Sequence, residues 1–165
     1  MLNIIQADTA EQIEAVRLLF REYEAWHGFD LCFQDYETEL AELPGKYAQP
    51  HGRLLLAYSD ESLAGCVAMR KLEDGICEMK RLFVRSGFRG ERIGVKLIEK
   101  LIADALEIGY KKMRLDTFPS IMAKAVKLYE SHGFVPIAPY YENPHDGVLF
   151  MELDLISHPI LRHRV

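Results

Sequence analysis

The sequence has few of the residues that would define its class at once. Its three cysteines, Cys32, Cys66 and Cys77, are odd in number and form no C-x-x-C pair. This argues against a disulfide framework and against a zinc ribbon. Each cysteine is therefore predicted to be a buried, small hydrophobic residue. The six histidines are scattered and form no H-E-x-x-H motif, so the sequence predicts no metal site.

Long apolar runs and blocks of positive charge are also missing. No segment reaches the length needed to cross a bilayer, and the first residues lack the basic and apolar regions of a secretion signal. We therefore expect a cytoplasmic protein. The formal net charge is -5 and no Lys/Arg run reaches the length of a tether, so neither a nucleic-acid nor a membrane partner is predicted. The acidic balance mildly favours a cationic substrate.

The composition is that of an ordinary globular domain. The chain has 165 residues, of which 49% are hydrophobic and 27% charged, enough to bury a core without disulfides or metals. We expect one domain over residues 1–165, with a short C-terminal tail at 157–165.

Hydrophobic periodicity predicts an alternation of strands and helices. Strands are expected at 2–7, 53–58, 63–72, 76–84 and 111–117 and in the closing runs FVPIA and GVLFMELDL, and helices at 10–26, 34–43, 90–107 and 121–131. Their order predicts an α/β (mixed α+β) fold, in which about four helices cover both faces of a mixed, mostly antiparallel sheet of about seven strands.

Local motifs predict where several elements begin and end. Thr9 and Gln12 form a capping box for the first helix, and Ser120 is expected to cap the last. Asp74-Gly75 predicts a type I′ hairpin between the strands at 63–72 and 76–84. Gly133 is expected to end the last helix in a left-handed conformation.

The segment RGERIG, residues 89–94, joins a strand to a helix and predicts an anion site. Backbone N–H groups in the first turn of a helix have no partner within the helix, and the helix dipole is positive there. Arg89 and Arg92 add charge suited to a ligand with several phosphates. The alternative is an ordinary strand-to-helix turn. The P-loop spacing is absent, and a hairpin precedes the segment, so the Rossmann fingerprint does not apply.

The run RLFV followed by RGERIG, a helix, a strand and then LYESHGF resembles the GNAT superfamily of N-acetyltransferases, and the resemblance is sharpest from residue 78 to 134. It implies acetyl-CoA as the acyl donor. The pantetheine arm would lie between strands 78–84 and 111–117, which splay apart. The cofactor-binding residues implied are Leu82, Phe83 and Val84 for the pantetheine and Arg89, Gly90, Glu91, Arg92, Ile93 and Gly94 for the diphosphate.

Two positions depart from the family pattern. Arg92 stands where the middle glycine usually lies. A position in the first turn of a helix needs no positive φ, and arginine keeps its N–H, so we expect binding to be retained. Met122 occupies the place where many relatives carry an asparagine that binds pantetheine, and that contact is not carried over.

The resemblance also implies the catalytic residues. Glu78 has the position of a general base, and Tyr129 has the position of a phenol that protonates the departing thiolate. The backbone N–H of Val84 or Phe83 would meet the oxyanion. The alternatives are that Glu78 is a cross-strand partner of Lys80 or Arg70, and that Tyr129 merely packs on the sheet.

Polar and aromatic residues outside this motif suggest an acceptor pocket. Tyr140, Tyr141 and Asn143 lie in the loop PYYENP and, with Trp26 and His27, are predicted to wall a small amine pocket; a rigid, proline-bounded turn is the alternative. The leading hypothesis is therefore acetyl transfer to a primary amine of a small molecule or peptide, by direct attack in a ternary complex. A catalytically silent acyl-CoA sensor and a protein-interaction module are the alternatives. The resemblance allows a homodimer, which no residue pattern here encodes.

Overall fold

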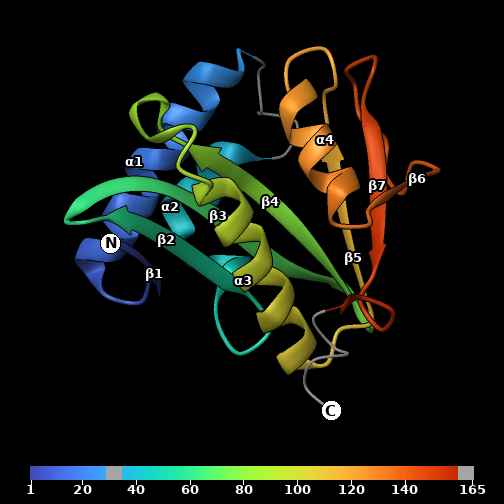
Figure 1. Cartoon of the computed structure of the whole chain (residues 1–165), viewed down its shortest axis with the longest axis horizontal. Helices are drawn as coiled ribbons and strands as arrows, with labels where there is room; N and C mark the ends of the chain where they lie inside the picture. Colours follow the sequence, from blue (N-terminus) through green and yellow to red (C-terminus); the bar gives the residue numbers. More distant parts are fainter. Residues whose placement is uncertain (29–34, 160–165) are drawn as a thin grey trace.

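A seven-stranded sheet crosses the molecule in the strand order β1-β2-β3-β4-β5-β7-β6 (Figure 1). The computed structural model describes residues 1–28 and 35–159. Among the strands in this described part of the chain, only β4 and β5 are parallel neighbours, and every other neighbouring pair is antiparallel. The strands are β1 (Leu2–Gln6), β2 (Arg53–Ser59), β3 (Ser62–Glu73), β4 (Ile76–Val84), β5 (Lys112–Thr117), β6 (Val135–Ile137) and β7 (Leu149–Asp154).

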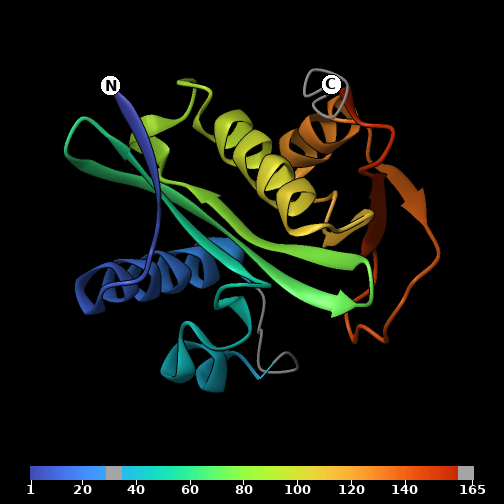
Figure 2. The same ribbon diagram turned by 90° about the horizontal axis from the view of Figure 1, so that it is seen from below.

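The helices lie on both faces of the sheet, as predicted. Helices α1 (Ala10–His27) and α2 (Tyr36–Glu42) cover one face, and α3 (Ile93–Ile108) and α4 (Ala123–Ser131) cover the other (Figure 2). Each face has its own cluster of buried apolar side chains. Among the described residues, short 3₁₀ helices at Gly45–Tyr47 and Ser86–Phe88 lie in the connections. Within 1–28 and 35–159, no helix is both long and apolar enough to cross a membrane.

Two of the predicted helix ends are confirmed, whereas the helices predicted from 34, 90 and 121 begin at Tyr36, Ile93 and Ala123. The capping box before α1 is present, since the Gln12 N–H donates to Thr9 Oγ1 and the Thr9 N–H donates to Gln12 Oε1. Gly133 follows α4 with a φ of 100°, and the N–H of Phe134 bonds back to the carbonyl of Tyr129. Cys66 and Cys77 are buried as expected. Cys32 and residues 160–165 of the predicted tail lie outside the described residues.

Two local predictions are wrong. The β3–β4 hairpin exists, but of its turn residues only Gly75 has a positive φ, whereas a type I′ turn requires positive φ at both central residues. Ser120 does not cap α4, because Ile121 and Met122 both donate their N–H groups to the carbonyl of Phe118. This turn delays the helix, which begins at Ala123 and has no side-chain cap.

The predicted gap in the sheet is confirmed between β4 and β5. These strands pair only at their beginnings, where Ile76, Cys77 and Glu78 lie opposite Lys112, Met113 and Arg114. Beyond this the strands diverge (Figure 1), while β5 stays paired with β7 as far as Thr117. The gap therefore leaves one edge of β4 without a neighbouring strand.

A β-bulge near the end of β4 alters the direction of its side chains. Ala68 of β3 lies opposite Lys80 and Cys66 lies opposite Phe83, so β4 has one residue more than β3 in this interval. Arg81 lies in the bulge with a φ of 61°. Bulges of this kind re-aim side chains and are frequent beside active sites.

Candidate active site at the gap in the sheet

The gap between β4 and β5 contains a cavity to which both layers of helices contribute. Tyr23 belongs to the apolar cluster beneath α1, and Tyr129 belongs to the cluster beneath α3 and α4. Because both line the same cavity, it extends through the plane of the sheet. Its lining includes Tyr23, His27, Met79, Lys80, Arg81, Leu82, Leu115, Asp116, Phe118, Met122 and Tyr129.

Tyr129 lies at the cavity with its phenol available. The side chain is buried, its ring packs 5.8 Å from that of Phe134, and the hydroxyl makes no hydrogen bond with any described residue. Burial, together with the nearby Tyr23 and Asp116, raises the pKa of Tyr129 above its ordinary value. The phenol therefore keeps its proton and can act as a hydrogen-bond donor.

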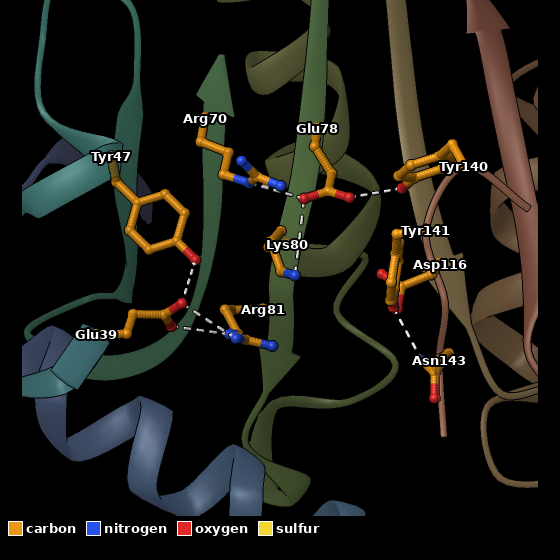
Figure 3. Close-up of polar contacts among 10 residues, drawn as sticks. All are labelled: Glu39, Tyr47, Arg70, Glu78, Lys80, Arg81, Asp116, Tyr140, Tyr141 and Asn143. Atoms are coloured by element: carbon orange, nitrogen blue, oxygen red, sulfur yellow. Dashed lines mark hydrogen bonds and ion pairs between the residues drawn. The ribbon is translucent and has the colours of Figure 1, made fainter. Parts of the chain in front are cut away.

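Glu78 is buried and fully engaged (Figure 3). Its Oε1 accepts a hydrogen bond of 2.9 Å from Arg70 Nε, and its Oε2 accepts one of 2.6 Å from the Tyr140 phenol. Lys80 Nζ lies 3.7 Å from Oε1. Burial alone would raise the pKa of Glu78, but the charges of Lys80 and Arg70 and these hydrogen bonds outweigh it and lower the pKa.

These contacts favour the cross-strand interpretation of Glu78. It lies directly opposite Arg70 in the β3–β4 ladder and does not line the cavity. A carboxylate with a lowered pKa is a weak base. The general-base role of Glu78 stays a prediction.

Lys80 is a buried cation that faces the cavity. Its side chain is 10% exposed, and its only ion pair in the described structure is the 3.7 Å contact with Glu78. Burial and the neighbouring charge of Arg81 lower the pKa of Lys80, although Glu78, Asp116 and Glu39 act in the opposite direction. The positive charge of its ammonium group is thus only partly balanced by nearby carboxylates.

Arg81 also lines the cavity, but its guanidinium group is held by a residue of α2. Its guanidinium group donates to both carboxylate oxygens of Glu39, at 3.0 and 3.2 Å, and lies 4.8 Å from the centre of the Tyr36 ring. Tyr47 adds a hydrogen bond of 2.9 Å to Glu39. The bulge thus turns the buried Arg81 toward the α1–α2 face, where Figure 3 shows this ion pair.

Asp116 and Lys80 are cavity residues to which the sequence reasoning gave no role in the site. Asp116 lies on β5 at the edge of the gap and lines the cavity. The Tyr141 phenol donates to its Oδ2, and Asn143 Nδ2 donates to that phenol at 2.9 Å. An acidic residue in the strand predicted to border the gap was the available signal.

The predicted acceptor residues divide into three groups. His27 lines the cavity, and burial, followed by the charge of Arg81, lowers its pKa. Tyr140, Tyr141 and Asn143 lie outside the lining and hold Glu78 and Asp116 in position. Trp26 does not reach this cavity, because its ring lies 5.3 Å from the Arg89 guanidinium group, beside the turn before α3.

The turn before α3 presents a series of backbone donors. The first bond of the helix runs from the Lys96 N–H to the carbonyl of Arg92. The N–H groups of residues 90 to 95 donate to no group in the described part of the chain. Around Gly90, which has a φ of 93°, an added Cβ would meet no atom within 4 Å. The N–H of Arg89 makes a long bond of 3.4 Å to Ser86.

The prediction for Arg92 is wrong in one respect. Arg92 precedes the helix and has a φ of 62°, in the left-handed region, whereas a position inside the first turn was expected. A non-glycine residue in this conformation costs about 1–2 kcal/mol. The cost explains why glycine is usual at this position, and the side chain does not remove the N–H.

The residues at the end of β4 have different surroundings. Leu82 lines the cavity, whereas Phe83 is buried with its ring 6.3 Å from that of Tyr23. The carbonyl of Val84 accepts a hydrogen bond of 3.2 Å from Arg89 Nε. This bond ties the turn before α3 to the end of the strand.

The model of the acetyltransferase (GNAT) family matches residues 14–134. The chain belongs to this family. It is 36% identical to an uncharacterized N-acetyltransferase of Dictyostelium discoideum, over 94% of the chain and 99% of the relative. A Schizosaccharomyces pombe N-acetyltransferase, also uncharacterized, is 38% identical over 93% and 95%, respectively. The GNAT chain also shares its fold with the PaiA N-acetyltransferase of Thermoplasma acidophilum in complex with coenzyme A, with a TM-score of 0.71 at 18% identity over 93% of this chain and 99% of that one.

Membership of the GNAT family identifies an acyltransferase that uses acetyl-CoA as its donor. The residues at the turn before α3 and along β4 fit acetyl-CoA. The N–H groups of residues 90 to 95, which have no partner among the described residues, suit a diphosphate. The edge of β4 that no described strand pairs with suits an extended chain such as pantetheine.

Proposed function

We propose that this GNAT chain acetylates a primary amine of a small molecule or peptide, by direct attack of the amine on the donor in a ternary complex. The observation that carries the proposal is the cavity through the sheet. Its lining joins Tyr129, on the face of α3 and α4, to Lys80 and Asp116 at the strands and to His27 from the opposite face. Donor and acceptor can then approach one reaction centre from the two faces.

The binding of the donor is assigned to the turn before α3 and to β4. The N–H groups of residues 90 to 95 would receive the diphosphate, with charge from Arg89 and Arg92. The edge of Leu82, Phe83 and Val84 would receive the pantetheine arm. When bound, acetyl-CoA supplies the acetyl thioester at the cavity.

Tyr129 is proposed to stabilise the leaving thiolate. An ordinary thiol has a pKa of about 8.5, and the pKa of Tyr129 is raised above that of a free phenol. Full proton transfer from Tyr129 is therefore unfavourable, whereas a hydrogen bond to a developing negative charge is strengthened by the buried surroundings. We assign Tyr129 the donation of this hydrogen bond.

The proton of the amine needs an acceptor. Glu78 was the sequence-based candidate, but its oxygens are bonded to Arg70 and Tyr140. Asp116 lines the cavity, and only its Oδ2 accepts a hydrogen bond from a described residue. We therefore propose Asp116 as the group that receives the proton, directly or through water, and Glu78 as part of the support of β4.

Steady-state kinetics test the proposal. Release of free CoA thiol from acetyl-CoA would be followed with a panel of primary amines. Direct attack predicts initial-rate lines that intersect when both substrates are varied, whereas an acetylated enzyme predicts parallel lines. Tight CoA binding without thiol release for any amine would support a silent acyl-CoA sensor. Absence of CoA binding would leave the protein-interaction module.

Two further properties are proposals from the sequence and its resemblance alone. We keep a cytoplasmic location and a homodimer as expectations. Cell fractionation tests the first, and sedimentation equilibrium of the full chain tests the second.

A further inference from the structure

Lys80 presents to the cavity an ammonium group that has no hydrogen bond to a described residue. Its ammonium lies on a nine-tenths buried side chain, and it makes no hydrogen bond with any residue of the described chain. An ammonium group has three donors, and a buried charge is stable only when it is paired. The one nearby anion on the same strand, Glu78, is 3.7 Å away, beyond hydrogen-bond distance.

Two of the anions near Lys80 are already committed to other donors. Glu78 accepts short hydrogen bonds from Arg70 and Tyr140, one on each oxygen. Glu39 is bonded to Arg81 and Tyr47. The protein has thus assembled an ion network around Lys80 in which the hydrogen-bonding capacity of this one cation is unused (Figure 3).

Asp116 provides the opposite charge in the same cavity. It lies on β5, across the gap from Lys80 on β4. Its Oδ2 is held by Tyr141, and its Oδ1 makes no hydrogen bond with the residues described. The cavity therefore offers an ammonium donor on one strand and a carboxylate acceptor on the other.

Resting on the proposed function, we infer that the acceptor carries a carboxylate as well as its amine, as a free amino acid does. Lys80 binds the carboxylate and Asp116 faces the amine. This pairing satisfies the unused donors of Lys80 with a charge-assisted hydrogen bond, the strong kind of hydrogen bond. The net charge of -5 for the whole chain does not describe this local site, where buried cations lie beside the acceptor.

A different role for Lys80 makes a different prediction. A buried lysine whose pKa is lowered can serve as a base. Its loss would then slow acetylation of every amine equally, because the chemistry would be impaired. An anchor for the carboxylate affects only acceptors that possess one. The two roles are separated by acceptors that differ in this group alone.

The experiment uses the full chain and pairs of free amino acids with their α-amides. Binding of each member is measured by calorimetry on the protein saturated with CoA, and turnover is measured with acetyl-CoA. We expect the carboxylate form to bind about 10- to 100-fold more tightly than its amide, the range of a hydrogen bond between charged groups. Lys80→Met should remove this preference, Lys80→Arg should retain part of it, and Lys71→Met, at an exposed position near the end of β3, should leave it unchanged.

The possible outcomes distinguish the inference about the carboxylate from the proposed function. Turnover of amides as good as that of amino acids would overturn the inference and leave the acetyltransferase proposal intact. A preference that survives in Lys80→Met, or a loss in that variant common to acids and amides, would also overturn it. Preferential binding of amino acids, without turnover of these or of any other primary amine tested, would uphold Lys80 as a carboxylate site and refute the proposed function. Absence of amino-acid binding, together with absence of turnover for every primary amine tested, would refute both. Circular dichroism and CoA affinity report whether Lys80→Met is folded.

Discussion

The Tyr140 phenol donates a 2.6 Å hydrogen bond to Glu78 across a separation of 62 residues in the chain. Together with Arg70, it fixes the carboxylate at the point where the pairing of β4 and β5 ends. The loop PYYENP thereby stabilises the end of the gap at which β4 and β5 are still paired. Tyr140, which was expected to contact the acceptor, thus holds a residue of β4 in position instead.

Glu78 should make the stability of the protein depend on pH in the acid range. Its pKa is lowered in the folded state, so its stabilising contribution is present above the unfolded value of about 4.3 and is lost as the pH falls through the folded value. We expect Glu78→Gln to cost about 3–5 kcal/mol near pH 7, because Arg70 and Lys80 lose their charged partner. Urea denaturation from pH 3 to 7 measures this. The exposed Glu61→Gln is the control, and an unchanged acid limb in Glu78→Gln would contradict the assignment.

The identity of the proton acceptor can be read from pH–rate profiles. We expect Asp116→Asn to lower kcat/KM by about 10²-fold or more and to flatten the acid limb. A series of acceptors with different amine pKa values is the control, because a limb that follows the acceptor belongs to the substrate. If Asp116→Asn keeps near-parental rates while Glu78→Gln, corrected for its folded fraction, loses them, Glu78 is the base.

Removal of the Tyr129 hydroxyl should affect the chemistry alone. Tyr129→Phe keeps the ring and its packing on Phe134, and the hydroxyl has no partner among the described residues to lose. We expect kcat to fall by about 10²-fold, with unchanged melting temperature and CoA affinity. A parental kcat would mean that Tyr129 is only a packing residue.

Two substitutions at Arg92 separate its charge from its backbone conformation. Arg92→Ala and Arg92→Gly both remove the charge, and both should weaken CoA binding by about 1–2 kcal/mol in a salt-dependent manner. Only glycine adopts the positive φ of 62° without strain. We therefore expect Arg92→Gly to be more stable than Arg92→Ala by about 1 kcal/mol, after allowance for the greater entropy of glycine in the unfolded chain.

Chemical denaturation without CoA and calorimetry with CoA provide the two measurements on Arg92. Equal stability of the alanine and glycine variants would argue against the left-handed conformation. Equal CoA affinity of parent and variants at low salt would show that the guanidinium group faces solvent.

The buried cysteines should be unreactive. Burial raises the pKa of the Cys66 and Cys77 thiols well above the ordinary range, and the thiolate is the reactive form. In a Cys32→Ser background, we expect the folded protein to resist a thiol reagent at pH 8 and to react after denaturation. Rapid labelling of the native protein would contradict the burial of these side chains.

The elements that depend on local chemistry were predictable from the sequence. The Thr9 capping box and the left-handed Gly133 are fixed by residues close in the chain, and both are confirmed. The gap between β4 and β5 was expected only through the family resemblance, since periodicity gives the strands but not where their pairing stops. The hairpin turn shows the limit of this reasoning, because a dipeptide such as Asp74-Gly75 favours a turn without fixing both φ angles.

The site was less predictable because its residues meet over long separations. Nothing in the spacing of Lys80 and Asp116 indicates that they line one cavity. Trp26 and His27 are neighbours in sequence, yet a step of one residue along a helix turns a side chain by about 100°. One ring therefore stacks near Arg89 and the other reaches the cavity.

The bulge in β4 makes the length of the strand as important as its composition. A regular strand would point Lys80 and Arg81 to opposite faces, and the extra residue allows both to reach the α1–α2 side of the sheet. Deleting Leu82 would restore the alternation and drive the Arg81 side chain toward the apolar layer beneath α3. The number of residues in this interval, rather than any single side chain, determines on which side of the sheet the charge lies.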